Sequence, residues 1–487
     1  MTHMPNSKIG KVWLVGAGPG DPGLLTCRGR EVLSEAEVVV FDRLVGDGIL
    51  ALMPQNAKCI NVGKEGGHHP IPQRKIEEIL VKEALEGHSV VRLKGGDPFM
   101  FGRGGEEIEA LLAHNIPYEV VPGVTSAIAA PAYAGIPVTH RGLANSLHII
   151  TGHTKEGNIS PQDYDALAKT GGTLVFLMGV SMVGEICEQL QKRGYPPTSP
   201  MAAVEWGTTA KSRAVLSTVA DFPTAAKEAS LHSPAVLIVG EVANLAGKFS
   251  WREALPLWNK KVIITRPRKR QGRLSKMLRV LGAEVVELPC IETVPLETKL
   301  PPLGNYAWLG FTSATGVECF FASLAKEGRD IREIGGAKIA AIGAATAKTL
   351  SKRGLKTDLV PQVYDGIHLA HELAKAAGDS PILMLRARDG SPELTQALKE
   401  LNANFLELPL YKTEAILQHF HPRDIDAVMF TSASTVRSFK AAFPDLEVPM
   451  ACCIGVQTAR EAERLGFKNI KVAKKATLND LISTLLE

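Results

Sequence analysis

The 487-residue sequence is poor in aromatic residues and has no long run of apolar ones. No stretch approaches the roughly 18 to 20 consecutive apolar residues that a membrane-spanning helix needs. The segment before the first apolar strand also lacks an apolar run of signal-peptide length. Low-complexity tracts are absent as well. We therefore predict a globular, cytoplasmic protein with no membrane partner.

Cysteine is scarce, and its seven copies lack the CxxC spacing of zinc or redox sites. None of the 13 histidines forms the HxxxH pair that places two metal ligands on one face of a helix. We expect reduced, mostly buried thiols, and we predict neither a metal site nor a catalytic cysteine. The seven positions are Cys27, Cys59, Cys187, Cys290, Cys319, Cys452 and Cys453.

The net charge of +4 is divided unevenly along the chain. Residues 1–259 carry 23 Lys and Arg against 26 Asp and Glu, whereas residues 260–487 carry 32 against 25. A basic second half suggests an anionic partner. Its densest run, RPRKRQGR at 266–273, is short and has no interleaved aromatics that could stack on bases. A carboxylate-rich small molecule is therefore the expected partner, and no nucleic acid is expected.

Glycine is plentiful, with 45 copies, and short apolar segments alternate with amphipathic stretches from Lys8 to about Gly247. Segments such as KVWLVGAG, AEVVVFD and HSVVRLKGGDP each end in a turn-forming residue. This alternation is typical of α/β folds, in which strand ends face a ligand. The length predicts more than one domain. We place a first domain at 1–248, a linker at 249–260 and a second domain at 261–487.

The second domain contains an internal repeat with a period of about 120 residues. VIITRPRKRQGRLSKMLRVLGAEVVELP, from Val262, aligns with ILMLRARDGSPELTQALKELNANFLELP, from Ile382. The motif FTSA at Phe311 recurs at Phe430, and an IGxxTA motif also occurs twice. Three repeated segments in the same order predict two similar α/β lobes.

The first strand runs into a glycine-rich turn, VWLVGAGPGDPGLLT, that is unsuited to a dinucleotide. A dinucleotide fingerprint needs a third glycine for close packing of the helix against the strand, and Asp21 stands there instead. A carboxylate would repel a pyrophosphate, and Pro19 and Pro22 lack the N–H groups that could bind one. An NAD-dependent oxidoreductase is thus excluded, and this turn needs a ligand without phosphate.

Several further turns carry polar or flexible residues, and each alone could be purely structural. FDRLV places Asp42 at a strand end, and NVGK places Lys64 in a turn. RLKGGDPFMFGRG combines two glycines with an acid, and PGVTSA adds two hydroxyls. A purely structural reading of every turn is hard to sustain when all of them occur together in this order.

Together with VGAGPGDPGLLT, PAYAGIPVTHR, LMG and EWGT, these turns closely resemble uroporphyrinogen-III C-methyltransferase, a member of the tetrapyrrole methyltransferase family. The resemblance covers roughly residues 8–247. It implies a two-lobed class III methyltransferase fold, S-adenosylmethionine held between the lobes, and a homodimer. By motif, the implied cofactor-binding residues are Pro19, Gly95, Gly96, Asp97, Met100, Thr125, Ser126, Met178 and Gly207. Ser126 is a small departure, because the family often has Ala there.

The same resemblance implies that Asp42 is the general base and Lys64 the proton donor. Methylating a pyrrole carbon leaves an extra proton that a carboxylate can accept, and a lysine can supply one where double bonds rearrange. A helix N-cap is the alternative role for Asp42, and carboxylate binding is the alternative for Lys64.

Residues 260–487 resemble uroporphyrinogen-III synthase, through the doubled FTS and IGxxTA motifs and the Tyr411–Thr413 motif. The resemblance implies a two-lobed α/β fold, with lobe one at about 261–295 plus 412–487 and lobe two at about 296–411. It further implies that hydroxymethylbilane is cyclised with inversion of the last ring. Because this substrate can close by itself to the wrong isomer, the enzyme mainly has to hold one geometry. This fits the lack of a strong acid or base constellation in the second half.

Tyr411 matches the family tyrosine that is proposed to assist departure of the substrate hydroxyl, with core packing as its alternative role. Hydroxyl-bearing turns at helix starts suit acetate and propionate carboxylates, although N-capping explains them equally well. Arg386, at a strand end, could bind a carboxylate through two hydrogen bonds. The predicted substrate-binding residues are Thr312, Ser313, Thr346, Arg386, Thr431, Ser432 and Thr458.

We therefore predict a bifunctional enzyme that makes uroporphyrinogen III and methylates it at C2 and C7 to give precorrin-2, for siroheme or cobalamin biosynthesis. The alternatives are a methyltransferase for a later corrin intermediate and a second half that binds a tetrapyrrole without cyclising it. The FDRLV and VGK motifs favour the uroporphyrinogen enzyme over the corrin one. Retention of Tyr411 and of both repeated motifs favours a catalytic second half.

Overall fold

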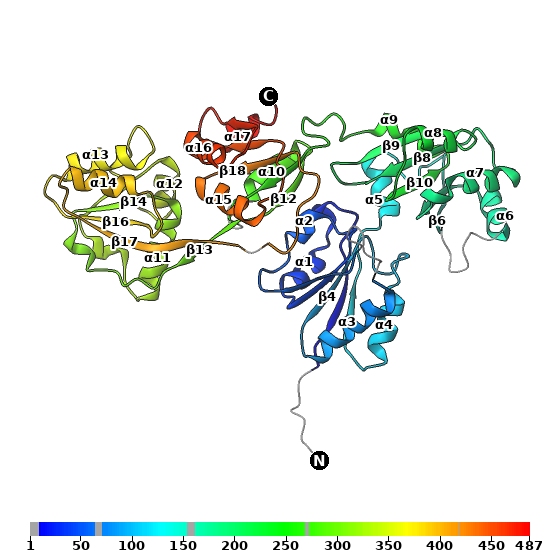
Figure 1. The fold of residues 1–487 in the computed structure, drawn as a ribbon, viewed down its shortest axis with the longest axis horizontal. Coiled ribbons are helices and arrows are strands. Elements are labelled where there is room, and N and C mark those ends of the chain that lie inside the picture. Colours follow the sequence, from blue (N-terminus) through cyan, green and yellow to red (C-terminus); the bar gives the residue numbers. More distant parts are fainter. Residues whose placement is uncertain (1–8, 64–70, 153–160, 268–271, 417) are drawn as a thin grey trace, which may run out of the picture. The chain divides into compact units, whose positions relative to one another are not determined.

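A computed structural model describes residues 9–63, 71–152, 161–267, 272–416 and 418–487, and it confirms the predicted α/β class. The chain forms two compact units. The first contains residues 1–290 and 417–487, and the second contains 291–416. The described residues form four five-stranded sheets, of which three belong to the first unit and one to the second (Figure 1).

The first sheet has the strand order β3-β2-β4-β1-β5, and all its neighbouring strands are parallel. Parallel strands place their carboxyl ends at one edge of the sheet, where ligands bind in open α/β sheets. Helices α3 and α4 pack against each other beside this sheet (Figure 1). Its elements are β1 (Val12–Gly16), α1 (Cys27–Ser34), β2 (Val38–Phe41), α2 (Asp47–Leu50), β3 (Lys58–Asn61), α3 (Gln73–Leu85), β4 (Val90–Lys94), α4 (Gly104–Leu112) and β5 (Tyr118–Val121).

The second sheet follows helix α5 (Ser126–Tyr133) and has the order β6-β7-β10-β8-β9. Only β6 and β7 are parallel, and the other three pairs are antiparallel. Central strand β10 is an apolar run, as expected for a strand covered on both faces. The elements are β6 (Leu147–Thr151), α6 (Pro161–Thr170), β7 (Thr173–Leu177), α7 (Val183–Lys192), β8 (Pro200–Glu205), β9 (Arg213–Thr218), α8 (Phe222–Glu228), β10 (Ala235–Val239) and α9 (Ala246–Phe249).

The third sheet is wholly parallel, in the order β12-β11-β18-β19-β20. It joins two stretches of chain that lie on either side of the second unit in the sequence. Its elements are β11 (Lys261–Ile264), α10 (Gly272–Val280), β12 (Glu284–Glu287), β18 (Ala427–Phe430), α15 (Ala433–Ala442), β19 (Ala451–Cys453), α16 (Val456–Arg464), β20 (Ile470–Val472) and α17 (Leu478–Ser483).

The second unit contains the sheet β13-β17-β16-β14-β15, in which only β13 and β17 are antiparallel. Alternate residues of β16 face opposite sides: Leu383 packs in the cluster that includes α11, and Met384 packs with α13 and α14. The elements are β13 (Ile291–Pro295), β14 (Trp308–Phe311), α11 (Ala314–Lys326), β15 (Lys338–Ala341), α12 (Ala344–Lys352), α13 (Gly366–Ala377), β16 (Ile382–Ala387), α14 (Pro392–Glu400) and β17 (Phe405–Ala415).

The internal repeat appears as the same local structure in both units. Ser313 follows β14 and caps α11 by accepting a hydrogen bond from the Gly316 N–H at 2.9 Å. Ser432 follows β18 and caps α15 by accepting one from the Thr435 N–H at 3.3 Å. A Ser with extended backbone before a helix is a favoured N-cap, so the repeated FTS motif marks a strand, a cap and a helix start.

None of the helices in the described ranges combines the length and the apolar character that a membrane crossing requires. All seven cysteines are free thiols; Cys27 is exposed, Cys59 is half-buried and the others are buried.

Alkylation of the folded protein with iodoacetamide at pH 8 should modify Cys27 and spare the buried thiols. Burial raises the pKa of Cys59 to about 11 and the pKa of Cys187 and Cys453 to about 12. Less of the reactive thiolate is therefore present at pH 8. Mass spectrometry of tryptic peptides measures the labelling, and all seven sites should react once the chain is denatured. Rapid labelling of Cys187 in the folded protein would contradict the packing described here.

Candidate active site

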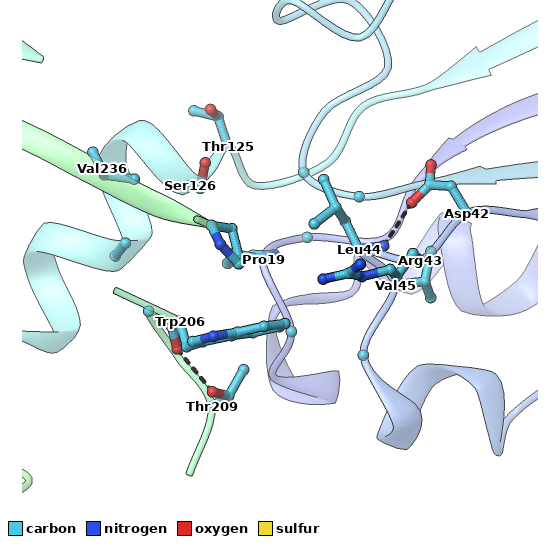
Figure 2. Close-up of a pocket in the computed structure, with 18 of the residues that line it drawn as sticks. Pro19, Asp42, Arg43, Leu44, Val45, Thr125, Ser126, Trp206, Thr209 and Val236 are labelled. Carbon is cyan, nitrogen blue, oxygen red and sulfur yellow. Dashed lines mark hydrogen bonds between the residues drawn. The ribbon is translucent and has the colours of Figure 1, made fainter. Parts of the chain in front are cut away.

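A cavity of about 620 Å³ lies in the first unit, at the carboxyl edge of the first sheet. The loops that follow β1, β2 and β4 form one side, and α5 and the segments after β7 and β8 form the other. Figure 2 shows Pro19 between two groups, with Thr125 and Ser126 on one side of it and Trp206 on the other. Asp42 and its loop lie on the opposite side of the cavity. The site is therefore built by two sheets rather than by one motif.

This cavity brings together every residue that the sequence analysis assigned to the cofactor, and also Asp42. The cofactor assignments themselves stay predictions. The residues on its wall are Pro19, Asp42, Gly95, Gly96, Asp97, Met100, Thr125, Ser126, Met178 and Gly207.

Glycines allow three of the loops at the cavity to pack closely against one another. Gly18 and Gly96 exchange two backbone hydrogen bonds, at 3.0 and 2.8 Å. A Cβ atom on Gly123 would lie 2.2 Å from the Gly96 carbonyl oxygen, so no larger residue fits there. Gly96 itself has φ +72°, and a Cβ on it would meet nothing within 4 Å. Its backbone is therefore open to a ligand.

Asp97 organises the loop that carries it. One carboxylate oxygen accepts hydrogen bonds from the Phe99 and Met100 N–H groups, at 2.9 and 3.1 Å. The other accepts one from the Gly123 N–H at 3.0 Å. The side chain thus ties the GGDP loop to the loop before α5, in addition to lining the cavity.

The carboxylate of Asp42 is held in place but remains accessible. It accepts a hydrogen bond from the Leu44 N–H at 3.0 Å (Figure 2), and its second oxygen lies 3.6 Å from Nη1 of Arg92. Its side chain is 25% exposed. The carboxylate is therefore fixed in orientation and faces the cavity, and its role as general base stays a prediction.

A buried charge cluster lies under Asp42, and the sequence analysis did not predict it. Arg92 and Lys94 are both on β4, and each contacts Oε1 of the fully buried Glu107, at 3.1 and 2.8 Å. Burial, with the nearby Arg92 cation, lowers the pKa of Lys94, and Glu107 opposes this shift. The sequence does contain an indication of this cluster, namely two cations inside the apolar segment VVRLK. Buried cations need counter-charges, so this pattern indicates buried ion pairs.

Asp21, which stands in place of the third glycine of a dinucleotide fingerprint, is not on the cavity wall. Its carboxylate caps the 3₁₀ turn Pro22–Leu24 by accepting the Gly23 N–H at 2.7 Å. The Tyr133 hydroxyl donates to the same carboxylate at 2.9 Å, and burial raises the pKa of that hydroxyl well above its usual value. Asp21 therefore ties the first loop to α5.

Lys64 lies outside the described residues, so its predicted role as proton donor stays a prediction. Among the described residues, one group has the spacing of a metal site, namely Glu83, Glu86 and His88 near the end of α3. It is not part of the cavity wall. Lys58 already neutralises Glu83 at 2.6 Å, so this group carries no argument for a metal.

In the second unit, Tyr411 on β17 and Ser313 after β14 are joined by a hydrogen bond of 2.8 Å between their hydroxyls. Ser313 already accepts the Gly316 N–H as the cap of α11. Either hydroxyl can be the donor in the bond between them. Tyr411 is 8% exposed and belongs to the core cluster of the unit. Thr312 precedes Ser313 and is half-buried.

The remaining predicted hydroxyl residues differ in exposure. Thr346 in α12 and Thr458 in α16 are buried, which favours packing over ligand contact for their side chains. Thr431 and Ser432 are half-buried at the start of α15, where Ser432 also contacts the Ser434 hydroxyl at 2.9 Å. Their substrate-binding roles stay predictions.

Arg386, a predicted carboxylate ligand, is 6% exposed and has partners within its own unit. Nη1 contacts Oε1 of Glu407 and the Thr395 hydroxyl, both at 2.6 Å, and Nη2 donates to the Ser391 carbonyl at 2.6 Å. These contacts connect β16, β17 and α14. They give Arg386 a structural role, and its predicted role in carboxylate binding stays a prediction.

Replacing Arg386 by Leu should lower the free energy of unfolding by about 2 to 3 kcal/mol, because Glu407 loses its partner in a largely buried pair. The KM for hydroxymethylbilane should change less than about twofold, since on this account no substrate contact is lost. Urea unfolding and initial-rate kinetics test this, with the exposed Arg332→Leu as control. A large rise in KM at unchanged stability would instead restore the carboxylate-binding role.

Comparison with known protein families gives one matching family for each half of the chain. Residues 11–223 match the family described as tetrapyrrole (corrin/porphyrin) methylases. Residues 272–483 match the family described as uroporphyrinogen-III synthase HemD. The porphyrin biosynthesis protein HemD of Ruminiclostridium josui is 44% identical over 98% of both chains. The chain belongs to this HemD family.

Relatives of the methylase half alone are also similar to this HemD-family chain. The S-adenosyl-L-methionine-dependent uroporphyrinogen III methyltransferase of Methanosarcina barkeri is 53% identical over 49% of this chain and 94% of its own. A crystal structure of the Thermus thermophilus uroporphyrin-III C-methyltransferase with S-adenosylhomocysteine is 42% identical, covering 48% of this chain and 99% of its own, with a TM-score of 0.42. The two family matches and the full-length relative confirm the resemblances to both families.

Proposed function

We propose that the chain is a bifunctional enzyme with uroporphyrinogen-III synthase and S-adenosylmethionine-dependent uroporphyrinogen-III C-methyltransferase activities. The second half cyclises hydroxymethylbilane to uroporphyrinogen III with inversion of ring D. The first half transfers two methyl groups to C2 and C7 and gives precorrin-2, which serves siroheme and cobalamin biosynthesis. Family membership over 98% of the chain supports both activities.

One observation carries the methyltransferase proposal: Asp42 and all nine predicted cofactor-binding residues lie on the wall of one cavity. The residues fit S-adenosylmethionine, because Gly96 leaves open space for a close approach and the first loop lacks the donors that a phosphate needs. Pro19, Gly95, Gly96 and Asp97 would hold the cofactor from the first sheet, and Thr125, Ser126, Met178 and Gly207 from the other side.

When bound, the cofactor supplies an electrophilic methyl group. The chain has to align a pyrrole carbon of the substrate with that group, and the loops around the cavity provide this alignment. Asp42 accepts the proton that leaves the methylated ring, since the Leu44 N–H and Arg92 hold its carboxylate in one orientation. Lys64 would return a proton to the rearranged double bonds.

For cyclisation, the pair of Tyr411 and Ser313 supports a role in removing the substrate hydroxyl. The phenolic proton of Tyr411 goes to the leaving hydroxyl, and the Ser313 hydroxyl keeps the phenol oriented through their 2.8 Å hydrogen bond. The half-buried turns at Thr312 and at Thr431–Ser432 lie at helix starts, where N–H groups and hydroxyls suit carboxylates. Each of these turns by itself can bind a substrate carboxylate.

Incubation of the purified protein with hydroxymethylbilane, with and without S-adenosylmethionine, tests both activities. We expect uroporphyrinogen III without cofactor and precorrin-2 with it. Uroporphyrin I alone would reject the synthase activity, and an unmethylated product with cofactor present would reject the methyltransferase activity. Light scattering on the same sample tests the homodimer that we propose for the methyltransferase half.

A further inference from the structure

Helix α2 connects the proposed methyltransferase site to the third sheet, which belongs to the second half of the chain. The loop Asp42–Gly46 leads directly into α2, whose first residue, Asp47, is 2% exposed. Lys261, Glu284, Arg423 and Asp424, all from the second half, are on the wall of the cavity. The motifs of the two activities lie in separate halves of the sequence, which therefore does not predict this shared wall.

Asp47 is the centre of a buried ion cluster. Its Oδ2 lies 2.6 Å from Nζ of Lys261, and its Oδ1 lies 3.2 Å from Nη2 of Arg423. The Arg423 backbone N–H also donates to Oδ2 at 2.9 Å. Lys261 in turn lies 3.5 Å from Glu284, whose other oxygen accepts the Ala210 N–H at 2.6 Å. Both cations that neutralise Asp47 thus come from the second half.

Apolar packing reinforces the same contact. A Cβ atom on Gly48 would lie 3.3 Å from the Val285 carbonyl oxygen, so α2 lies close to edge strand β12. Ala51 is part of the core cluster of the third sheet, and Phe420 packs against that cluster and against the core of the first sheet. His419 contacts the Gln55 carbonyl at 2.8 Å. Helix α2 therefore covers an edge strand that would otherwise be open.

The loop that bears Asp42 has little freedom to move independently of α2. The Val45 N–H donates to the Asp42 carbonyl at 3.3 Å, and the Ile49 N–H of α2 donates to the Gly46 carbonyl at 2.9 Å. A Cβ on Gly46 would lie 2.5 Å from the Gly20 carbonyl oxygen, so the loop also packs on the first cofactor loop. A displacement of α2 would therefore shift Asp42 relative to the cofactor residues.

We propose that Lys261 and Arg423 are positioning residues for methyl transfer: by neutralising Asp47, the second half of the chain holds α2 and the Asp42 loop in the reactive geometry. The proposal rests on the methyltransferase activity proposed above. It predicts that methylation depends on an ion pair supplied by the synthase half. A misplacement of about 1 Å can reduce a rate about 100-fold.

The test uses full-length variants and uroporphyrinogen III supplied directly. Lys261→Met should reduce the kcat for methylation at least about tenfold, because Asp47 loses a buried partner. S-adenosylmethionine affinity, measured by equilibrium dialysis, and cyclisation of hydroxymethylbilane should stay within about twofold. Lys261→Arg should restore most of the kcat, because it returns the cation. Lys260→Met, which alters an exposed neighbour, is the matched control.

The second variant, Asp47→Asn, removes the charge that the methyltransferase half contributes to the same cluster. It should show the same selective loss of the kcat for methylation. Unchanged methylation in both variants would overturn the proposal. A parallel loss of cyclisation and cofactor binding would also overturn it, because that result indicates a general folding role. If the wild-type chain itself does not methylate uroporphyrinogen III, the proposed methyltransferase function fails instead.

Discussion

Replacing Asp42 by Asn should reduce methylation of uroporphyrinogen III by at least about 100-fold and leave cyclisation of hydroxymethylbilane unchanged. Asn has nearly the same shape and can still accept the Leu44 N–H bond that orients Asp42. It cannot accept the proton released from the methylated ring. The loss should therefore fall on the kcat for methylation, while S-adenosylmethionine affinity stays within about twofold.

Single-turnover methylation by the purified variant, followed by the absorbance of precorrin-2, measures this effect. Asp221→Asn is the matched control, because Asp221 precedes α8 and is not on the cavity wall. Loss of both activities in Asp42→Asn would show that Asp42 supports folding, as an N-cap would. Full methylation by the variant would show that another group accepts the proton.

Replacing Tyr411 by Phe should slow enzymatic cyclisation about 10- to 100-fold and shift the product toward uroporphyrinogen I. The variant loses only the hydroxyl that lies 2.8 Å from the Ser313 hydroxyl. Hydroxymethylbilane that is not processed closes by itself to the unrearranged isomer, so the isomer ratio reports the loss directly. Methylation of supplied uroporphyrinogen III should be unaffected.

Chromatographic separation of the oxidised isomers measures the ratio. Tyr306→Phe serves as the control, because Tyr306 packs against the same core cluster. Ser313→Ala should have a smaller effect on the ratio, together with a loss of about 1 kcal/mol of stability from the missing cap of α11. An unchanged isomer ratio in Tyr411→Phe would assign Tyr411 to core packing alone.

Much of the fold could be predicted because local patterns decide it. Alternating apolar segments and turn residues predicted the α/β class, and the doubled FTS motif predicted two equivalent strand-to-helix turns, which the structure shows at Ser313 and Ser432. Pro19, Asp42 and the GGDP loop lie on one cavity wall because the parallel strands of the first sheet bring their carboxyl ends together, and the second sheet adds Met178 and Gly207.

Side-chain roles were harder to predict, because they depend on which partners the folded chain brings into contact. Arg386 is predicted to bind a substrate carboxylate, and the structure adds contacts of its guanidinium with Glu407 and the Ser391 carbonyl that the sequence did not predict. Asp21 counted in the sequence only against a dinucleotide, and the structure shows that it caps a turn and accepts a hydrogen bond from Tyr133. Thr346 and Thr458 are buried in the first turns of α12 and α16, and their substrate-binding roles stay predictions.

The sequence by itself determined the two families, the loops of the cavity and the residues proposed for catalysis, because these depend on short motifs and their order along the chain. Only the tertiary structure decided which charges meet. Arg92 and Lys94 share the buried Glu107, and Asp47 is neutralised by Lys261, which lies 214 residues away. Such pairs depend on desolvation and distance, which arise only when separate segments pack together.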